Sequence, residues 1–225
     1  PSGKLFWRRW KNRKMPLETA NLNPEQGQNM ILRVTQYGEP VLREQGKPIA
    51  VFDSSLRDLA LSMIETMHES RGIGLAAQQI GIPAMLCVVD LHQDGVDNDF
   101  SYSLDGKQPP LDLWMPLTLV NPVIEGFSKE TDFCEEGCLS FPGIHGEIER
   151  PDAIQVSFLD TEGKPHTLSC NGYLARCIQH EVAHLNGVLF IDRMEKDSLR
   201  DAKPAIRRLK ERTIRSMQKA ARVNV

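Results

Sequence analysis

The segment His180-Glu181-Val182-Ala183-His184 constrains the fold more than any other stretch of this chain. In an α-helix each residue turns by about 100°, so residues four apart lie on one side, separated by about 40°. The segment therefore predicts a helix whose two imidazoles can bind one cation. Glu181 lies about 80° from the middle of the pair. It is close enough to act on a water at the cation and poorly placed to be a ligand.

A catalytic metal site of this kind needs a third protein ligand and one open position. Metzincins carry a third histidine six residues after the second one, and Phe190 stands there in this chain. Cys138 is a better candidate, because Gly137 and polar neighbours surround it, unlike most cysteines of a protein core. A thiolate with two imidazoles suits Zn²⁺ or Fe²⁺. Simple buried packing of Cys138 is the alternative.

A structural zinc site is a second interpretation of the same residues. Cys134, Cys138, His180 and His184 have C-x₃-C and H-x₃-H spacings that a Cys₂His₂ site accepts. Such a closed site would leave Glu181 without a role. A general metallopeptidase is a third interpretation, but no recognition groups for an internal peptide are evident.

Local patterns predict an α+β chain in which strands pair mostly as hairpins and helices are separate from them. A helix is expected from Ser54 or Ser55, either of which can cap it, to Glu69, and another from Gly172 to Asn186, ended by Gly187. Strands are expected at 85–89, 119–125 and 154–158, a turn at 160–163 and a long loop at 92–116. A basic helix is expected at 197–222, with Pro204 near its first turn or at a kink.

Charge divides the chain into an acidic body and two basic ends. The net charge is −3, yet residues 1–14 hold six basic residues and no acid. We expect a flexible extension at 1–29, a catalytic domain at 30–195 and a basic helix with its tail at 196–225. This distribution does not favour specific DNA recognition.

The number of cysteines and the lengths of the apolar runs indicate the cellular compartment in which the chain works. Five cysteines in a chain of this length indicate a reducing environment, and no apolar run approaches the roughly 20 residues of a membrane span. We expect a cytoplasmic bacterial protein, or an organellar one if the basic start is a processed leader.

Three motifs in order resemble the peptide deformylase family. They are Gly72–Gln79, with two glycines and two alanines before the glutamines, then Glu136–Ser140, and then Gln179–His184. The resemblance runs from about Ile31 to about Asp192. It implies small antiparallel sheets packed around a central helix that carries the His-Glu-x-x-His motif, followed by a C-terminal helix.

The resemblance also implies roles for individual residues. Cys138, His180 and His184 would bind one divalent metal, Fe²⁺ above all, with Zn²⁺, Ni²⁺ or Co²⁺ accepted. Glu181 would move the proton, while the Gln79 side chain and the Leu139 backbone N–H would form the oxyanion hole. The substrate would be an N-formyl-methionyl nascent peptide, contacted by Ile73, Gly74, Gly137, Tyr173 and Cys177. The C-terminal helix would bind the ribosome, as it does in some members.

One position departs from the family pattern. An aspartate usually stands before the second histidine, and this chain has Ala183. Position 183 flanks the ligand face on the side opposite Glu181, so the aspartate is best interpreted as an anchor to a basic group, for which Arg150 is a candidate. Its absence leaves a catalytically weakened deformylase-like protein as an alternative.

Overall fold

A computed structural model describes residues 30–92 and 100–223. The extension predicted for residues 1–29 lies outside these residues, as does part of the predicted loop at 92–116. Within the described part of the chain, no helix is long and apolar enough to cross a membrane.

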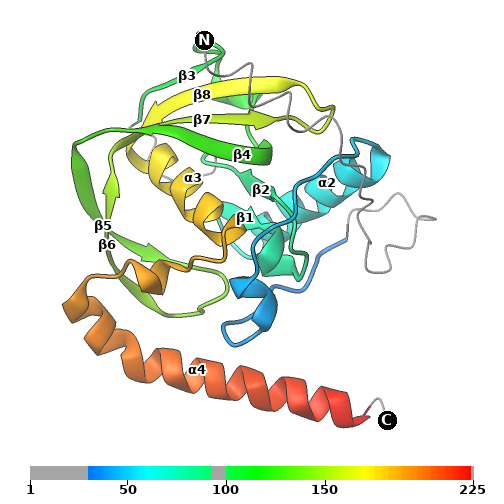
Figure 1. Ribbon diagram of the computed structural model, residues 1–225, viewed down its shortest axis with the longest axis vertical. Coiled ribbons are helices and arrows are strands. Elements are labelled where there is room, and N and C mark those ends of the chain that lie inside the picture. The colour runs from blue at the N-terminus through cyan, green and yellow to red at the C-terminus, as the bar shows by residue number, and fades with distance from the viewer. Residues whose placement is uncertain (1–29, 93–99, 224–225) are drawn as a thin grey trace.

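The α+β class predicted from the sequence is confirmed (Figure 1). The described helices are α2 (Ser54–Glu69), α3 (Gly172–Leu185) and α4 (Lys196–Val223), with 3₁₀ turns η1 (Pro40–Arg43), η2 (Ala77–Ile80), η3 (Leu111–Leu113) and η4 (Phe190–Asp192). The strands are β1 (Gly74–Ala76), β2 (Leu86–Val89), β3 (Tyr102–Leu104), β4 (Leu117–Phe127), β5 (Thr131–Gly137), β6 (His145–Pro151), β7 (Ala153–Leu159) and β8 (Pro165–Asn171). They form a six-stranded sheet in the order β1-β2-β4-β7-β8-β3 and a two-stranded sheet β5-β6, and the strands pair antiparallel.

The large sheet is covered on both faces at β2. Leu86 and Val88 belong to the apolar cluster that packs with α2, while Cys87 and Val89 belong to the cluster that packs with α3. Side chains of a strand alternate between its two faces, so a strand covered on both sides reads as a continuous apolar run. β2 carries such a run, and all four of its residues are buried.

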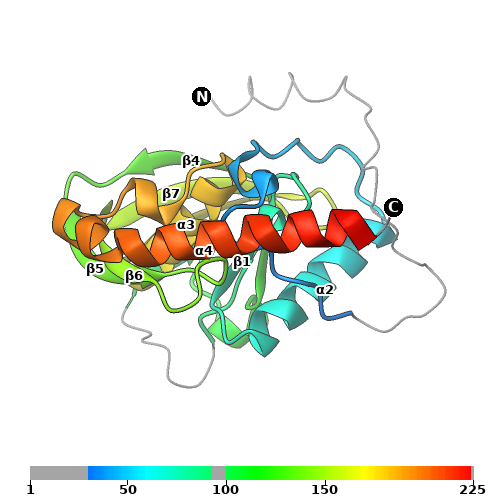
Figure 2. The same ribbon diagram turned by 90° about the horizontal axis from the view of Figure 1, so that it is seen from below.

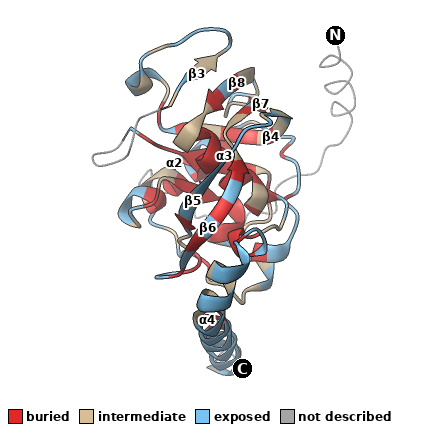
Figure 3. Ribbon diagram, turned by 90° about the vertical axis from the view of Figure 1, so that its left-hand side faces the viewer, coloured by how far each residue is buried: buried red, intermediate tan, exposed pale blue. Residues whose placement is uncertain are grey.

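Helix α3 lies between the large sheet and the β5-β6 hairpin (Figure 1), and buried residues gather around it (Figure 3). It ends where the sequence predicted, because Gly187 follows with φ +70°. A Cβ atom at Gly187 would lie 2.6 Å from the carbonyl oxygen of Arg43. Both the left-handed conformation and this close approach favour glycine. The central helix with the His-Glu-x-x-His motif thus forms as predicted.

Helix α4 crosses the lower side of the molecule (Figure 2). Ile206 and Leu209 bury their side chains beside Phe190 and Met194 in a third apolar cluster. Much of the remaining surface of α4 is exposed (Figure 3). The basic helix therefore forms as predicted and is docked on the body through one apolar stripe.

Three local predictions need correction. Asp53, and not Ser54 or Ser55, caps α2, because its carboxylate accepts the backbone N–H groups of Ser55 and Leu56. The predicted loop at 92–116 contains β3, which pairs with β8, and the turn η3. Pro204 stands beyond the first turn of α4, so the first of its two predicted places is wrong, and the kink stays a prediction.

Candidate active site

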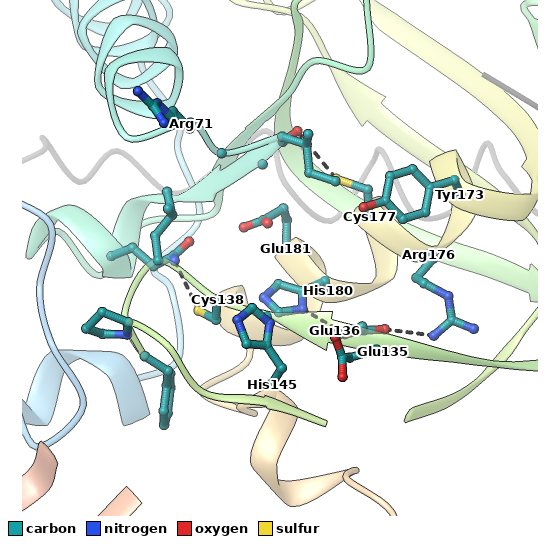
Figure 4. Close-up of a pocket in the computed structure, with 18 of the residues that line it drawn as sticks. Arg71, Glu135, Glu136, Cys138, His145, Tyr173, Arg176, Cys177, His180 and Glu181 are labelled. Atoms are coloured by element: carbon teal, nitrogen blue, oxygen red, sulfur yellow. Dashed lines mark hydrogen bonds and ion pairs between the residues drawn. The ribbon is translucent and has the colours of Figure 1, made fainter. Parts of the chain in front are cut away.

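A cavity of about 500 Å³ opens between β1, the end of β5 and one side of α3 (Figure 4). All the sequence-predicted site residues except His184 lie in its wall: Ile73, Gly74, Gln79, Gly137, Cys138, Leu139, Tyr173, Cys177, His180 and Glu181. Residues from three distant segments of the sequence therefore meet in one place. Five further charged or titratable residues were not predicted here: Arg71, Glu135, Glu136, His145 and Arg176.

One sulfur and two imidazole nitrogens converge beside this cavity, and two of these residues, Cys138 and His180, line it. Donor atoms of Cys138, His180 and His184 all lie within 4.8 Å of one another, and Sγ of Cys138 is 3.3 Å from Nε2 of His184. Burial, followed by the positive charges of His180 and Arg150, lowers the pKa of His184 well below its ordinary value. A neutral imidazole has a lone pair for a metal ion, so this donor set fits a tetrahedral cation with one open position.

The ring of His180 is oriented by a carboxylate. Its Nδ1 lies 2.9 Å from Oε2 of Glu136, so Nε2 is left to face Cys138. Burial lowers the pKa of His180, but hydrogen bonds to Cys138 and Glu136 outweigh it and raise the pKa to about 10. The pocket therefore favours positive charge at this point. Metal-binding histidines commonly carry such a carboxylate on the other ring nitrogen.

Two buried arginines hold Glu136 in place. Arg150 donates through Nε and Nη2 at 2.5 and 2.8 Å, and Arg176 donates through Nη1 at 2.9 Å. Burial raises the pKa of Glu136, but Arg150 and His180 overcome this effect and hold it below the usual range. The sequence analysis missed this role of Glu136. The signal was the repeat of Arg176, His180 and His184 at intervals of four along α3.

Glu181 points into the cavity from the same helix (Figure 4). Its Oε2 is buried and has no hydrogen-bond partner in the described structure. Burial raises the pKa of Glu181 to about 7. A Cβ atom at Gly74 would lie 2.3 Å from Oε1 of Glu181. The glycine of β1 thus provides the space that this carboxylate occupies, which explains the small residues of the Gly72–Gln79 segment.

Two N–H donors border the same space. Oε1 of Gln79 accepts the backbone N–H of Ala76 at 2.8 Å, which fixes the amide so that Nε2 faces Cys138 at 3.4 Å. The backbone N–H of Leu139 donates to no acceptor among the described residues. The Leu139 N–H is therefore available for an oxygen atom of a ligand, whereas Nε2 of Gln79 already makes two long contacts, to Sγ of Cys138 at 3.4 Å and to Oγ of Ser140 at 3.5 Å.

The opposite wall is mostly apolar. Ile73, Tyr173 and Cys177 lie together there, and Sγ of Cys177 donates to the carbonyl of Ile73 at 3.5 Å. Burial raises the pKa of Cys177 well above its ordinary value, and burial likewise raises that of Tyr173. Both side chains are therefore neutral at physiological pH, as the wall of an apolar subsite requires.

Cys134 does not join the donor group. The grouped donors in the described part of the chain are Cys138, His180 and His184. Cys134 lies within β5 opposite Ile148, and four residues of strand span about 13 Å. This extended backbone explains why the C-x₃-C spacing does not close a Cys₂His₂ site. Arg150, considered as a partner for position 183, is bound to Glu136.

A metal-ligand set of one thiol and two imidazoles, beside a buried glutamate in an open cavity, is typical of metal-dependent hydrolases. Comparisons with known proteins specify the class. The model of the polypeptide deformylase family matches residues 31–200. The peptide deformylase of Opitutus terrae is 59% identical over 169 residues, which are 74% of this chain and 86% of that protein.

Solved structures agree with this match. A peptide deformylase from Synechococcus elongatus in complex with actinonin has a TM-score of 0.65 and 42% identity over 76% of this chain and 85% of its own. A plant peptide deformylase has a TM-score of 0.70 and 33% identity over 80% of this chain and 90% of its own. The chain belongs to the peptide deformylase family, whose members are metal-dependent hydrolases that remove the formyl group from N-terminal methionine.

Proposed function

We propose that this chain hydrolyses the formyl group from N-formyl-methionyl nascent peptides with the residues that meet in the cavity. The observation that carries the proposal is the convergence of Cys138, His180 and His184, since Cys138 and His180 line one cavity together with Glu181. Membership of the peptide deformylase family supports the same reaction. The Cys₂His₂ zinc site and the inactive relative are not favoured.

The proposed ligands are Sγ of Cys138 and Nε2 of His180 and His184. A thiolate and two imidazoles suit Fe²⁺, which we take as the native metal, and also Zn²⁺, Ni²⁺ and Co²⁺. The metal supplies a Lewis acid that makes a bound water more acidic. Glu136, clamped by two arginines, keeps the His180 ring turned toward the ligand position.

Glu181 is the proposed proton carrier. Its buried carboxylate accepts a proton from water as the water oxygen forms a bond to the formyl carbon. When the C–N bond breaks, the same proton passes to the leaving amine nitrogen, and formate and a free methionine amine result. A pKa raised to about 7 by burial suits both directions of this transfer.

Gln79 and Leu139 are the proposed oxyanion donors. During attack the formyl oxygen gains negative charge, and Nε2 of Gln79 and the backbone N–H of Leu139 can stabilise this charge by donating hydrogen bonds to the oxygen. The hydrogen bond from Ala76 holds the Gln79 amide in this orientation before substrate arrives. Donors fixed in advance contribute about 10²–10³ each to the rate.

Substrate binding is assigned to the remaining walls. The methionine side chain would lie against Ile73, Tyr173 and Cys177, while Gly74 and Gly137 would let the peptide backbone come close. These five residues line the cavity that contains Glu181. A neutral thiol, an aromatic ring and an isoleucine suit a thioether side chain.

The experiment that tests the assignment is Glu181→Gln. Glutamine keeps the shape and cannot accept the proton, so we expect full metal content and turnover reduced by about 10²–10⁴. Elemental analysis and formate release are measured on the same samples. Glu69→Gln, on an exposed residue at the end of α2, is the matched control and should equal the parent protein in both. Loss of metal in Glu181→Gln would place this glutamate among the ligands and contradict the scheme.

We also propose which parts of the chain carry out catalysis and ribosome binding. Residues 30–195 form the catalytic part, and residues 196–225 form a basic segment that binds ribosomal RNA where formylated chains emerge. Arg207 and Arg215 have side chains that are 78% and 80% exposed. The apolar stripe of α4 completes a buried cluster, so truncation of the helix would disturb the body. We place this activity in the bacterial cytoplasm, or in an organelle if residues 1–29 include a leader.

The ribosome proposal is tested by charge removal rather than by truncation. Arg208, Arg212 and Lys219 line one shallow groove of α4 together with Arg215. A triple variant with Arg208→Gln, Arg212→Gln and Lys219→Gln should co-sediment less with ribosomes at low salt. The parent protein's binding to ribosomes should weaken steeply as the salt concentration rises. Unchanged co-sedimentation of the triple variant would contradict it.

A further inference from the structure

A second cavity, of about 630 Å³, lies on the reverse side of α3. Gln179, Val182, Ala183 and Asn186 line it, whereas Cys177 and His180 line the first cavity. At about 100° per residue, Asn186 is half a turn from Cys177, so the two cavities lie on opposite faces of one helix. The other wall is formed by β4, from Pro122 to Ile124 and at Phe127.

The wall of this reverse cavity is mostly apolar and includes two arginines. The apolar lining comprises Met85, Pro122, Val123, Ile124, Phe127, Val182, Ala183 and Val188. Arg150 and Arg193 bring two guanidinium groups, and none of the described lining residues is acidic. Such a surface is complementary to a molecule with one anionic group and an apolar body.

Arg150 is the decisive residue. It is 2% exposed, and its Nε and Nη2 both donate to Glu136, while its Nη1 donates to no acceptor among the described residues. Arg176 donates to the same carboxylate, so two buried guanidinium groups share Glu136. Asp132 lies 3.7 Å from Arg176, but its side chain is 67% exposed and solvent screens its charge. Glu181 is a second buried carboxylate whose charge interacts with that of Arg150, so what this cluster offers a further anion is the unused Nη1 donor of Arg150.

Arg193 provides a second hydrogen-bond donor for a ligand in the reverse cavity. Arg193 is exposed, makes no hydrogen bond or ion pair within the described part of the chain, and lines the cavity. A planar carboxylate matches guanidinium geometry well and forms strong charge-assisted hydrogen bonds. The volume falls within the range of about 300–1,000 Å³ that is usual for small-molecule sites.

From the cavity, its apolar wall and the two arginines, we infer that the reverse face of α3 binds an aliphatic carboxylate of medium chain length. The carboxylate accepts hydrogen bonds from Arg150 and Arg193, and the alkyl chain lies along Pro122, Val123 and Ile124. Arg150 also holds Glu136, which orients His180. A single side chain therefore connects this ligand with the active site.

Isothermal titration calorimetry of the full chain with octanoate tests the inference, with octan-1-ol and octylamine as probes of equal length. Charge-assisted hydrogen bonds to arginine predict that octanoate binds at least about 10-fold more tightly than either. Equal affinity for octanoate and octan-1-ol, or no binding of octanoate, would overturn the inference.

Two matched substitutions locate the binding. Ile124→Trp fills the reverse cavity and should abolish octanoate binding, whereas Ile73→Trp fills the first cavity and should leave it unchanged. Both isoleucines are half-buried and pack against the same apolar cluster. Loss of binding in Ile73→Trp alone would place octanoate in the active site and refute the inference.

Changes of charge give an independent test if Ile124→Trp does not fold. Arg193→Gln should weaken octanoate about 10-fold, while Arg207→Gln on α4 should not. Ala183→Asp places a carboxylate of the chain itself in the cavity and should also weaken octanoate, whereas the neutral Ala183→Asn should retain most of the affinity. Equal affinities across these four variants would contradict the inference.

Discussion

Gly74→Ala tests how closely the chain fits around the proposed base. The added Cβ would lie 2.3, 2.8 and 2.9 Å from Oε1, Cδ and Cγ of Glu181. Ordinary contacts of such atoms are about 3.5 Å, so the carboxylate must move by about 1 Å. A displacement of this size in a catalytic group costs about 10²-fold, and complete loss of the proton transfer costs about 10²–10⁴-fold. The three atoms nearest to the added Cβ all belong to Glu181 and none to a proposed ligand, so we expect kcat to fall in this range while metal content stays full.

Formate release gives kcat and KM, and elemental analysis gives the metal. Gly126→Ala is the matched control, because a Cβ there would meet only Cβ of Gln155 at 3.9 Å. A displaced base lowers kcat, whereas a blocked cavity raises KM. Combined with Glu181→Gln, the change at Gly74 should cost little more, since the base is already lost. Parent-like kcat in Gly74→Ala would refute the reasoning, because Glu181 would not be the proton carrier in this position.

Three further predictions concern the support of the site and the helix that begins the body. Glu136→Gln removes the anchor of His180 and should weaken metal binding about 10–100-fold, measured by competition with a chelator; unchanged affinity would remove Glu136 from this role. Iron-loaded protein should lose activity in air faster than nickel-loaded protein, because Fe²⁺ beside the Cys138 thiolate exposes both metal and sulfur to oxidation, and equal lifetimes would argue against that site. Asp53→Ala removes the cap of α2 and should lower the midpoint of urea denaturation, whereas an unchanged midpoint would mean that solvent replaces the cap.

The sequence predicts the central features because they are local. Residues 172–186 carry helical periodicity and a glycine stop, so α3 and the common side of His180 and His184 follow from spacing alone. β2 is a short apolar run, and β7 alternates, so both are recognisable as strands. The family motifs then bring Cys138 and Gly72–Gln79 to the same helix.

The features that escape prediction depend on contacts between distant residues. Glu136 meets Arg150 and Arg176, which lie 14 and 40 positions further along the chain. β3 has three residues within a stretch rich in glycine, proline and aspartate, and it forms because β8 offers a free edge. Asp53 outcompetes the serines as a cap because it stands one residue before the helix begins. The reverse cavity, with Ala183 in its wall, exists only once α3 packs on β4.

Release of formate from formyl-Met-Ala-Ser by anaerobically prepared, iron-loaded protein tests the central claim most directly. The account predicts catalytic turnover of the formylated peptide and none of the acetylated peptide, whose extra methyl group crowds the carbonyl carbon. The activity should depend on added metal and disappear in Glu181→Gln. Absence of formate from fully loaded, folded protein, or equal cleavage of both peptides, would contradict it.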